Sequence, residues 1–137
     1  MKFQDARNIV GDTPYLSADK GQELYNHILK THPANCLELG HAHGVSTIYI
    51  AAAHEETGQG CLDTVDLQSS LEREPNLETL LEGTSLVHIV NIHREWKQIN
   101  VRAKTIPVGM RRTELITRTS FLVPRTSIVT GRLCSGV

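Results

Sequence analysis

The feature that most restricts the fold of this chain is a regular alternation of short apolar segments with helical segments. The two stretches with helical punctuation span about 45–57 and 76–82. The apolar segments have the length and composition of buried strands, and they span 34–40, 61–67 and 86–92. Strands and helices that alternate through short connections are typical of βαβ units. The pattern therefore predicts an α/β fold with a Rossmann-like parallel sheet and flanking helices.

Capping and breaking residues predict where the helices begin and end. Ser17 can cap a further helix that precedes the first strand, and Pro33 ends it. Gly58 terminates the helix that follows the first strand, while Pro75 and Gly83 bracket the next one. Each predicted strand is thus separated from the next by one helix.

Length and composition indicate a single soluble domain. A chain of 137 residues with 39% hydrophobic side chains is long enough for one core. It contains no apolar run near the ~20 residues that would span a bilayer, and its start lacks the pattern of a secretory signal. Cys36, Cys61 and Cys134 are odd in number and far apart, so we expect no disulfide framework. These features predict a cytoplasmic protein without a membrane partner.

Charge divides the chain into two parts near residue 100. Residues 1–100 hold 7 Lys or Arg against 14 Asp or Glu, whereas residues 101–137 hold 7 against the single Glu114. The segment 98–137 is therefore an atypical basic C-terminal segment, either an arm for anionic partners or a poorly ordered tail. Because the whole chain has a net charge of only -1, we expect no nucleic-acid partner.

A glycine-containing turn between the first strand and the following helix is the main candidate for a binding site. Ligands of open parallel sheets bind beyond the carboxyl ends of the strands, which here are residues 38–46 and 66–68. The dinucleotide pattern GxGxxG needs Gly at 40, 42 and 45, and only Gly40 is present. The pattern ExGxGxG is met by Glu38, Gly40 and Gly44, with Ala42 in place of the middle glycine. Such a turn lets a ligand approach the main chain and offers amides to an anion.

Three motifs in order along residues 13–92 resemble a known family. They are TPYLSADKGQEL before the first strand, LELGHAHGVST at the glycine turn and TVDL at the close of the second strand. This set resembles the class I S-adenosylmethionine-dependent methyltransferases, and among them the small-molecule O-methyltransferases related to the catechol and caffeoyl-coenzyme A enzymes. The resemblance implies that residues 1–97 form the S-adenosylmethionine-binding half of such a fold.

The resemblance also implies a role for individual residues. Glu38 would orient the methionine amino group of the cofactor, and Ser46 would bind its carboxylate. Asp66 would accept hydrogen bonds from both ribose hydroxyls, a task that suits an ionised carboxylate. The cofactor-binding residues implied in this way are Glu38, Gly40, His41, Ala42, His43, Gly44, Ser46, Asp66 and Leu67.

Catalytic residues and a metal site are not indicated by the sequence. In the catechol-type relatives a divalent metal is held by acidic side chains beyond the fourth strand, but after Glu95 this chain has only Glu114. His41 and His43 form a pair that lacks a clear third ligand, so we expect no metal. Trp96 is open to two interpretations, stacking on the adenine or packing in the core.

Two functions follow as hypotheses. The first is an S-adenosylmethionine-dependent methyltransferase that acts on a small-molecule acceptor, with oxygen as the expected target atom, and whose activity is impaired by the atypical C-terminal part. The alternative is a non-catalytic cofactor-binding remnant or interaction module. The three predicted strands and their helices use about 92 of the 137 residues, which favours an incomplete methyltransferase fold. A homo-oligomer is compatible with either hypothesis.

Overall fold

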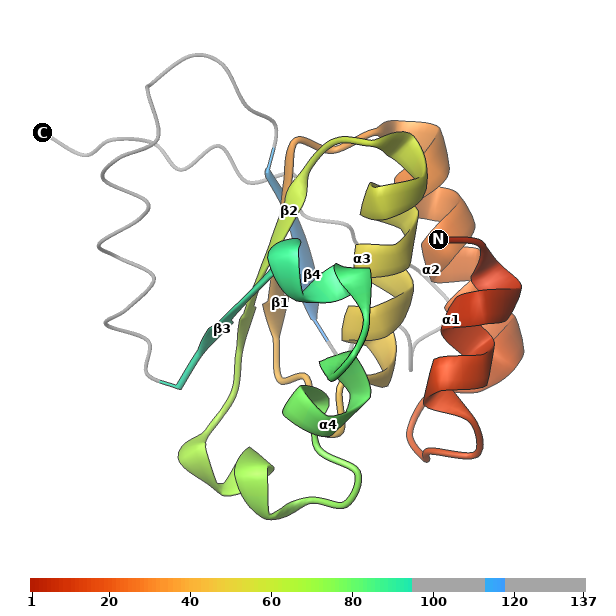
Figure 1. Cartoon of the computed structure of the whole chain (residues 1–137). Helices are drawn as coiled ribbons and strands as arrows, with labels where there is room; N and C mark the ends of the chain where they lie inside the picture. The colour runs from red at the N-terminus through yellow and green to blue at the C-terminus, as the bar shows by residue number, and fades with distance from the viewer. Residues whose placement is uncertain (95–112, 118–137) are drawn as a thin grey trace, which may run out of the picture.

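A parallel sheet with helices on one face forms the body of the protein. In the computed structural model, residues 1–94 are described in full and residues 113–117 by their backbone. The sheet has the strand order β3-β2-β1-β4, and all three pairings are parallel. Helices α1, α2 and α3 lie on one face of this sheet (Figure 1). The strands are β1 (Asn35–Leu39), β2 (Cys61–Val65), β3 (Val90–His93) and β4 (Thr113–Thr117), and the helices are α1 (Phe3–Val10), α2 (Ala18–Thr31), α3 (Val45–Thr57) and α4 (Leu77–Leu81).

The predicted α/β class, with a parallel sheet and flanking helices, is confirmed. Helix α2 begins directly after Ser17, whose hydroxyl accepts a hydrogen bond from the Lys20 amide at 3.4 Å. Helix α3 spans the predicted residues, and its end at Gly58 has the left-handed conformation that glycine adopts readily. Strands β1 and β2 lie within the predicted segments, and each is two residues shorter than its segment.

The predicted third strand, 86–92, is wrong in its first half. Residues Ser85–His88 form a short 3₁₀ helix, and β3 begins only at Val90. Leu86 is fully buried, but the next two side chains are exposed, which no strand with alternating faces would produce. The β-branched composition therefore indicated burial correctly, but not the backbone conformation.

Among the α-helices and strands that the structure describes, two were not predicted. Helix α1 precedes all the predicted elements, and β4 pairs with β1 from within the segment 98–137. The rest of that segment and Trp96 lie outside the described residues, as do all of the basic positions of the C-terminal part. The domain boundary near residue 98 therefore stays a prediction.

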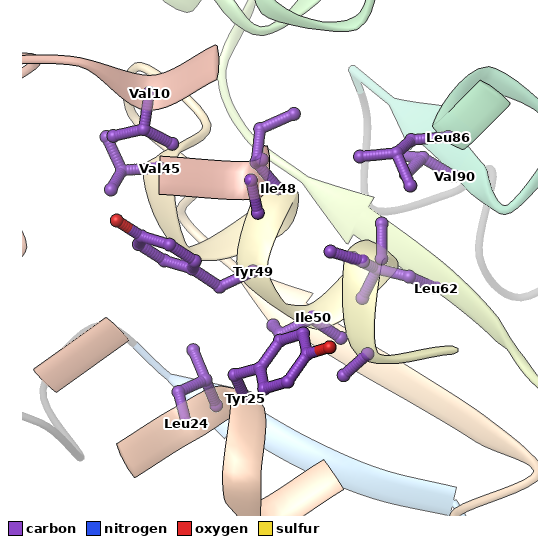
Figure 2. Close-up of a cluster of buried hydrophobic side chains, with 14 of the residues drawn as sticks. Val10, Leu24, Tyr25, Val45, Ile48, Tyr49, Ile50, Leu62, Leu86 and Val90 are labelled. Carbon is purple, nitrogen blue, oxygen red and sulfur yellow. The ribbon is translucent and has the colours of Figure 1, made fainter. Parts of the chain in front are cut away.

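Helix α3 is the centre of the core. Its residues from Ile48 to His54 are all buried, because α3 packs on the sheet with one side and on α1 and α2 with the other. Figure 2 shows apolar side chains from α1, α2, α3, β2 and β3 that converge around it. The ring of Tyr49 stacks on Phe3 at 5.1 Å, so the aromatic contacts hold α1 against α3. The core thereby fixes the start of α3, where the glycine turn ends.

Backbone hydrogen bonds join the carboxyl ends of the strands. The amide of Gly40 donates to the carbonyl of Val65 at 2.7 Å, and the amide of Asp66 donates to the carbonyl of His93 at 3.2 Å. The turn after β1 and the residues after β2 and β3 therefore lie side by side, at the end of the sheet near α4 (Figure 1). Within the described part of the chain, every helix is too short or too polar to cross a lipid bilayer.

Candidate functional site

The turn between β1 and α3 is formed by residues in the left-handed backbone region. Gly40 has φ of +82°, Ala42 of +53° and Gly44 of +97°, and the Gly44 amide donates to the His41 carbonyl at 2.7 Å. A Cβ added at Gly44 would lie 2.5 Å from Leu77, so α4 requires glycine there. A Cβ at Gly40 would meet nothing within 4 Å, which leaves the main chain open to a ligand at this point.

A cavity of about 390 Å³ lies between this turn and the segment that precedes α2. Its volume is in the range of small-molecule binding pockets. One wall comes from the residues before and at the start of α2, the other from the turn and the first residues of α3. The residues that line the cavity are Pro14, Tyr15, Leu16, Ser17, Lys20, Gly40, His41, Ala42, His43, Val45 and Ser46.

Glu38 lies beneath the turn with its carboxylate enclosed. Its side chain is buried, with only 2% of the residue exposed. One carboxylate oxygen accepts a hydrogen bond from the Ser46 hydroxyl, and the other accepts from Thr47 at 2.6 Å and Thr64 at 2.7 Å. Three hydroxyl donors therefore compensate the loss of water around this carboxylate. They also tie the start of α3 to strands β1 and β2.

Asp66 directly follows β2, and its carboxylate binds the turn. One of its oxygens accepts from the Ala42 amide and the other from the Leu67 amide, each at 2.7 Å. The side chain remains 19% exposed, so its remaining lone pairs are accessible to further donors. Leu67, the next residue, is 73% exposed. An acid and an apolar side chain are thus presented together beyond the end of β2.

His41 is held inside the site as a neutral ring. Its Nε2 lies 3.2 Å from Nη1 of Arg94, and its Nδ1 lies 3.2 Å from the carbonyl oxygen of Ala42. Because guanidinium only donates and a carbonyl only accepts, Nδ1 carries the proton and Nε2 accepts. Burial lowers the pKa of His41, the Arg94 charge adds to this, and the carboxylates of Glu38 and Asp66 oppose it. Arg94 also donates to Ser70 and Glu78, and burial lowers its pKa.

His43 is held in place by contacts with Pro75 and Tyr15. Its Nδ1 lies 2.6 Å from the carbonyl oxygen of Pro75. Its ring stacks on Tyr15, with centroids 5.4 Å apart and an interplanar angle of 27°. The guanidinium of Arg73 lies 5.8 Å from the centroid of the Tyr15 ring. Tyr15 itself has φ of +87°, an unusual conformation for an aromatic residue.

The structure brings the residues implied by the resemblance to one end of the sheet. Some of them line the cavity, and the others lie outside its lining. Gly40, His41, Ala42, His43 and Ser46 line the cavity. Glu38, Gly44, Asp66 and Leu67 lie outside the lining and support the turn or flank it. Among the residues described, no group of three or more His, Cys, Asp or Glu is arranged to hold a metal ion.

Sequence reasoning missed several residues of the site. Tyr15 and Lys20 line the cavity, although the sequence assigned the motif TPYLSADKGQEL only to the leading helix. A tyrosine beside Pro14 in a polar segment is a signal for a binding loop that could have identified the first of them. Arg94 could not have been identified, because its contact with His41 joins residues 53 positions apart.

Comparison with known proteins agrees with the topology. No family model matches the chain, and no curated protein is similar to it in sequence. Among solved structures, it is similar to the O-methyltransferase TomG from Streptomyces achromogenes in complex with SAM, with a TM-score of 0.57, 19% identity, and coverage of 85% of this chain and 52% of that one. An O-methyltransferase from Bacillus cereus in complex with SAH has a TM-score of 0.56 at 14% identity and is covered over 53% of its length.

A third structure, the cofactor-bound protein Rv0187 from MTB, has a TM-score of 0.55 at 19% identity, and the match covers 82% of this chain and 50% of that one. The chain therefore spans about half the length of each of these three structures. The resemblance to a methyltransferase fold is confirmed: this chain has the fold of the O-methyltransferases over about half of their length.

Proposed function

We propose that this chain binds S-adenosylmethionine and transfers its methyl group to an oxygen of a small-molecule acceptor. The observation that carries the proposal is the open turn at Gly40 beside a partly exposed Asp66, at the carboxyl ends of adjacent strands on an O-methyltransferase fold. Parallel-sheet proteins bind their ligands at this end. The charge of Asp66 and the open main chain at Gly40 fit this cofactor.

Each part of the site suits one part of that cofactor. Asp66 has free lone pairs for the two ribose hydroxyls, and Leu67 offers an apolar surface next to them. The backbone amides at the start of α3, including that of Ser46, suit the carboxylate. Glu38 supports this region through the hydroxyls of Ser46 and Thr47. The bound cofactor would supply an electrophilic methyl group on a positively charged sulfur, so the protein has to align the acceptor and remove its proton.

A titration of the protein with S-adenosylhomocysteine tests the proposed site directly. We expect binding heat for the unaltered chain, and we expect Asp66→Ala to weaken binding by about 1.5 to 3 kcal/mol, the range for lost hydrogen bonds to a charged group. Asp63→Asn is the matched control, because Asp63 lies on β2 three residues before Asp66 and accepts from His93. Absence of heat at millimolar ligand would remove the proposal, and an unchanged affinity of Asp66→Ala would place the ribose elsewhere.

A second function, a cofactor-binding module without turnover, is favoured by the lack of acidic residues in the C-terminal part of the sequence, where Glu114 is the only acid after Glu95. Transfer of a radiolabelled methyl group to a panel of phenols and carboxylic acids separates the two functions. Turnover by pure protein excludes the module without catalysis, whereas binding without turnover supports it.

A further inference from the structure

We propose that His43 is the general base that takes the proton from the acceptor hydroxyl. The inference rests on the proposed function and adds a catalytic residue to it. His43 lines the cavity, and its ring nitrogens differ in their surroundings.

The tautomer of His43 follows from its hydrogen-bond partner. Nδ1 lies 2.6 Å from the carbonyl oxygen of Pro75, which can only accept a hydrogen bond. Nδ1 of the neutral ring must therefore carry the proton, and Nε2 must carry the lone pair. A histidine whose Nδ1–H is fixed by an acceptor and whose Nε2 is free to accept has the arrangement of a general base.

The ring is also held in place before any ligand binds. Tyr15 stacks on it at 5.4 Å, and Pro75 directly precedes Asn76, whose side chain caps α4 by accepting from the Thr79 amide at 2.9 Å. His43 keeps only 8% of its surface exposed while it lines the cavity. A base in this position needs little reorganisation when the acceptor arrives.

Other ionisable groups near the cavity are less suited to the role. His41 uses Nε2 to accept from Arg94, and Lys20 is an ammonium that donates to Glu23 at 2.7 Å. The carboxylate of Glu38 lies outside the cavity lining and is occupied by three hydroxyls. Tyr15 is a phenol, and its oxygen is a much weaker base than a neutral imidazole. Among the described lining residues, His43 alone therefore has a ring nitrogen that is available to accept the proton.

The step involves one proton and one bond. The O–H bond of the acceptor breaks, its proton moves to Nε2 of His43, and its electron pair stays on the acceptor oxygen, which becomes the nucleophile. His43 becomes an imidazolium that keeps its Nδ1–H bond to Pro75 and later releases the new proton to water. No further reactant is needed for this step.

Nitrogen NMR tests the tautomer without any activity. Correlations between ring protons and ring nitrogens distinguish protonated from unprotonated nitrogens, and His43→Asn identifies the signals by their loss. We expect the neutral ring of His43 to carry its proton on Nδ1 and to leave Nε2 unprotonated. A neutral ring protonated on Nε2 would overturn the proposal.

Methyl transfer to phenols of graded acidity tests the role itself. His43→Asn keeps a donor for the Pro75 carbonyl but removes the base, and His88→Asn is the matched control because His88 is exposed and precedes β3 at the other end of the sheet. With phenol as acceptor we expect His43→Asn to be slower by about 100-fold or more. With pentafluorophenol, which is already ionised at neutral pH, we expect the deficit to fall to about tenfold or less, since no proton has to be removed.

The possible outcomes separate the role of His43 as a base from the binding of the cofactor. An equal deficit of His43→Asn with both phenols assigns a structural role and overturns the base. Cofactor binding without methylation of any phenol also overturns it, while the cofactor site stands. If S-adenosylhomocysteine does not bind at all, the proposed function fails, and the titration reports this independently of His43.

Discussion

At the scale of single residues, the site depends on the unusual conformation of Ala42. An L-residue at φ of +53° costs about 1 to 2 kcal/mol relative to an ordinary conformation. The Ala42 amide donates to the charged Asp66 at 2.7 Å, and a hydrogen bond of this kind contributes about 1.5 to 3 kcal/mol. The bond can therefore offset the strain, and it holds the carboxylate beside the turn. The conformation of the turn and the position of the Asp66 carboxylate therefore stabilise each other.

Gly44 should be the least replaceable residue of the turn. A methyl group at Gly44 would lie 2.5 Å from Leu77 Cδ1 and 3.2 Å from the Leu77 backbone, at a φ of +97°. We expect Gly44→Ala to lower the free energy of unfolding by about 3 kcal/mol or more, from backbone strain plus overpacking. Urea denaturation followed by circular dichroism measures this loss.

Gly58→Ala is the matched control for Gly44. Gly58 also has a positive φ, of +68°, but a Cβ there would meet nothing within 4 Å. We expect this variant to lose only about 1 kcal/mol, from strain alone. Equal losses in the two variants would show that the contact with Leu77 does not constrain the turn.

His41 should make stability depend on pH below neutrality. Burial lowers its pKa from the ordinary value of 6.5, so the unfolded chain binds this proton more tightly than the folded one. The contribution of neutral His41 is fully present above pH 6.5 and is lost as the pH falls through the lowered pKa. We expect the free energy of unfolding to decrease from pH 7 towards pH 5, as measured by urea denaturation at each pH.

His41→Gln isolates this contribution, because a glutamine oxygen can still accept from Arg94 but does not titrate. We expect a flatter pH profile for this variant than for the unaltered chain between pH 7 and pH 5. Parallel profiles would assign the loss to other groups.

The spacing of Glu38, Gly40, Gly44, Ser46 and Asp66 was sufficient to predict which residues gather at the end of the sheet. Their partners were not predictable. Whether a histidine accepts from an arginine or donates to a proline carbonyl depends on the packing of distant segments, and sequence spacing contains no information about it. The assignment of a cofactor-binding role to each residue stays a prediction.

At the scale of elements, α3 was predicted to the residue because both its ends carry glycine in a left-handed conformation. Helix α1 was not predicted, since its eight residues lack a side-chain cap and are held by tertiary contacts such as the stacking of Phe3 on Tyr49. The start of β3 was misplaced because Leu86 is buried in a 3₁₀ helix. Local signals thus fix the elements that have strong caps, and packing decides the others.

The contact between α2 and α3 depends on Gly21. A Cβ at this position would lie 2.4 Å from the ring of Tyr49, which is 1% exposed and therefore cannot move freely. Alanine favours a helix interior over glycine by about 1 kcal/mol, whereas overpacking a core costs about 1 to 3 kcal/mol. We expect Gly21→Ala to destabilise the protein in urea denaturation, against its helix propensity.

A double-mutant cycle identifies the cause. In the background of Tyr49→Leu, which removes the ring, we expect Gly21→Ala to become neutral or stabilising. The same loss in both backgrounds would mean that Gly21 is required for a reason other than the Tyr49 ring.

At the scale of the whole molecule, the site joins segments that are distant in sequence. The segment before α2, the turn after β1 and the loop before α4 meet around the cavity and His43. A ligand that contacts both cavity walls binds only when these segments are assembled. Binding should therefore stabilise the folded state as a unit, although the chain spans only about half of a complete methyltransferase structure.

This linkage gives a prediction for global stability. A ligand that binds only the folded state at about one hundred times its dissociation constant adds about 2.7 kcal/mol to the free energy of unfolding. We expect S-adenosylhomocysteine to produce this increase in urea denaturation of the unaltered chain. Asp66→Ala at the same ligand concentration should gain much less, because its dissociation constant is closer to that concentration, and Asp63→Asn should gain as much as the unaltered chain. Binding heat without any gain in stability would show that the ligand also binds the unfolded chain, and would place its site outside the assembled end of the sheet.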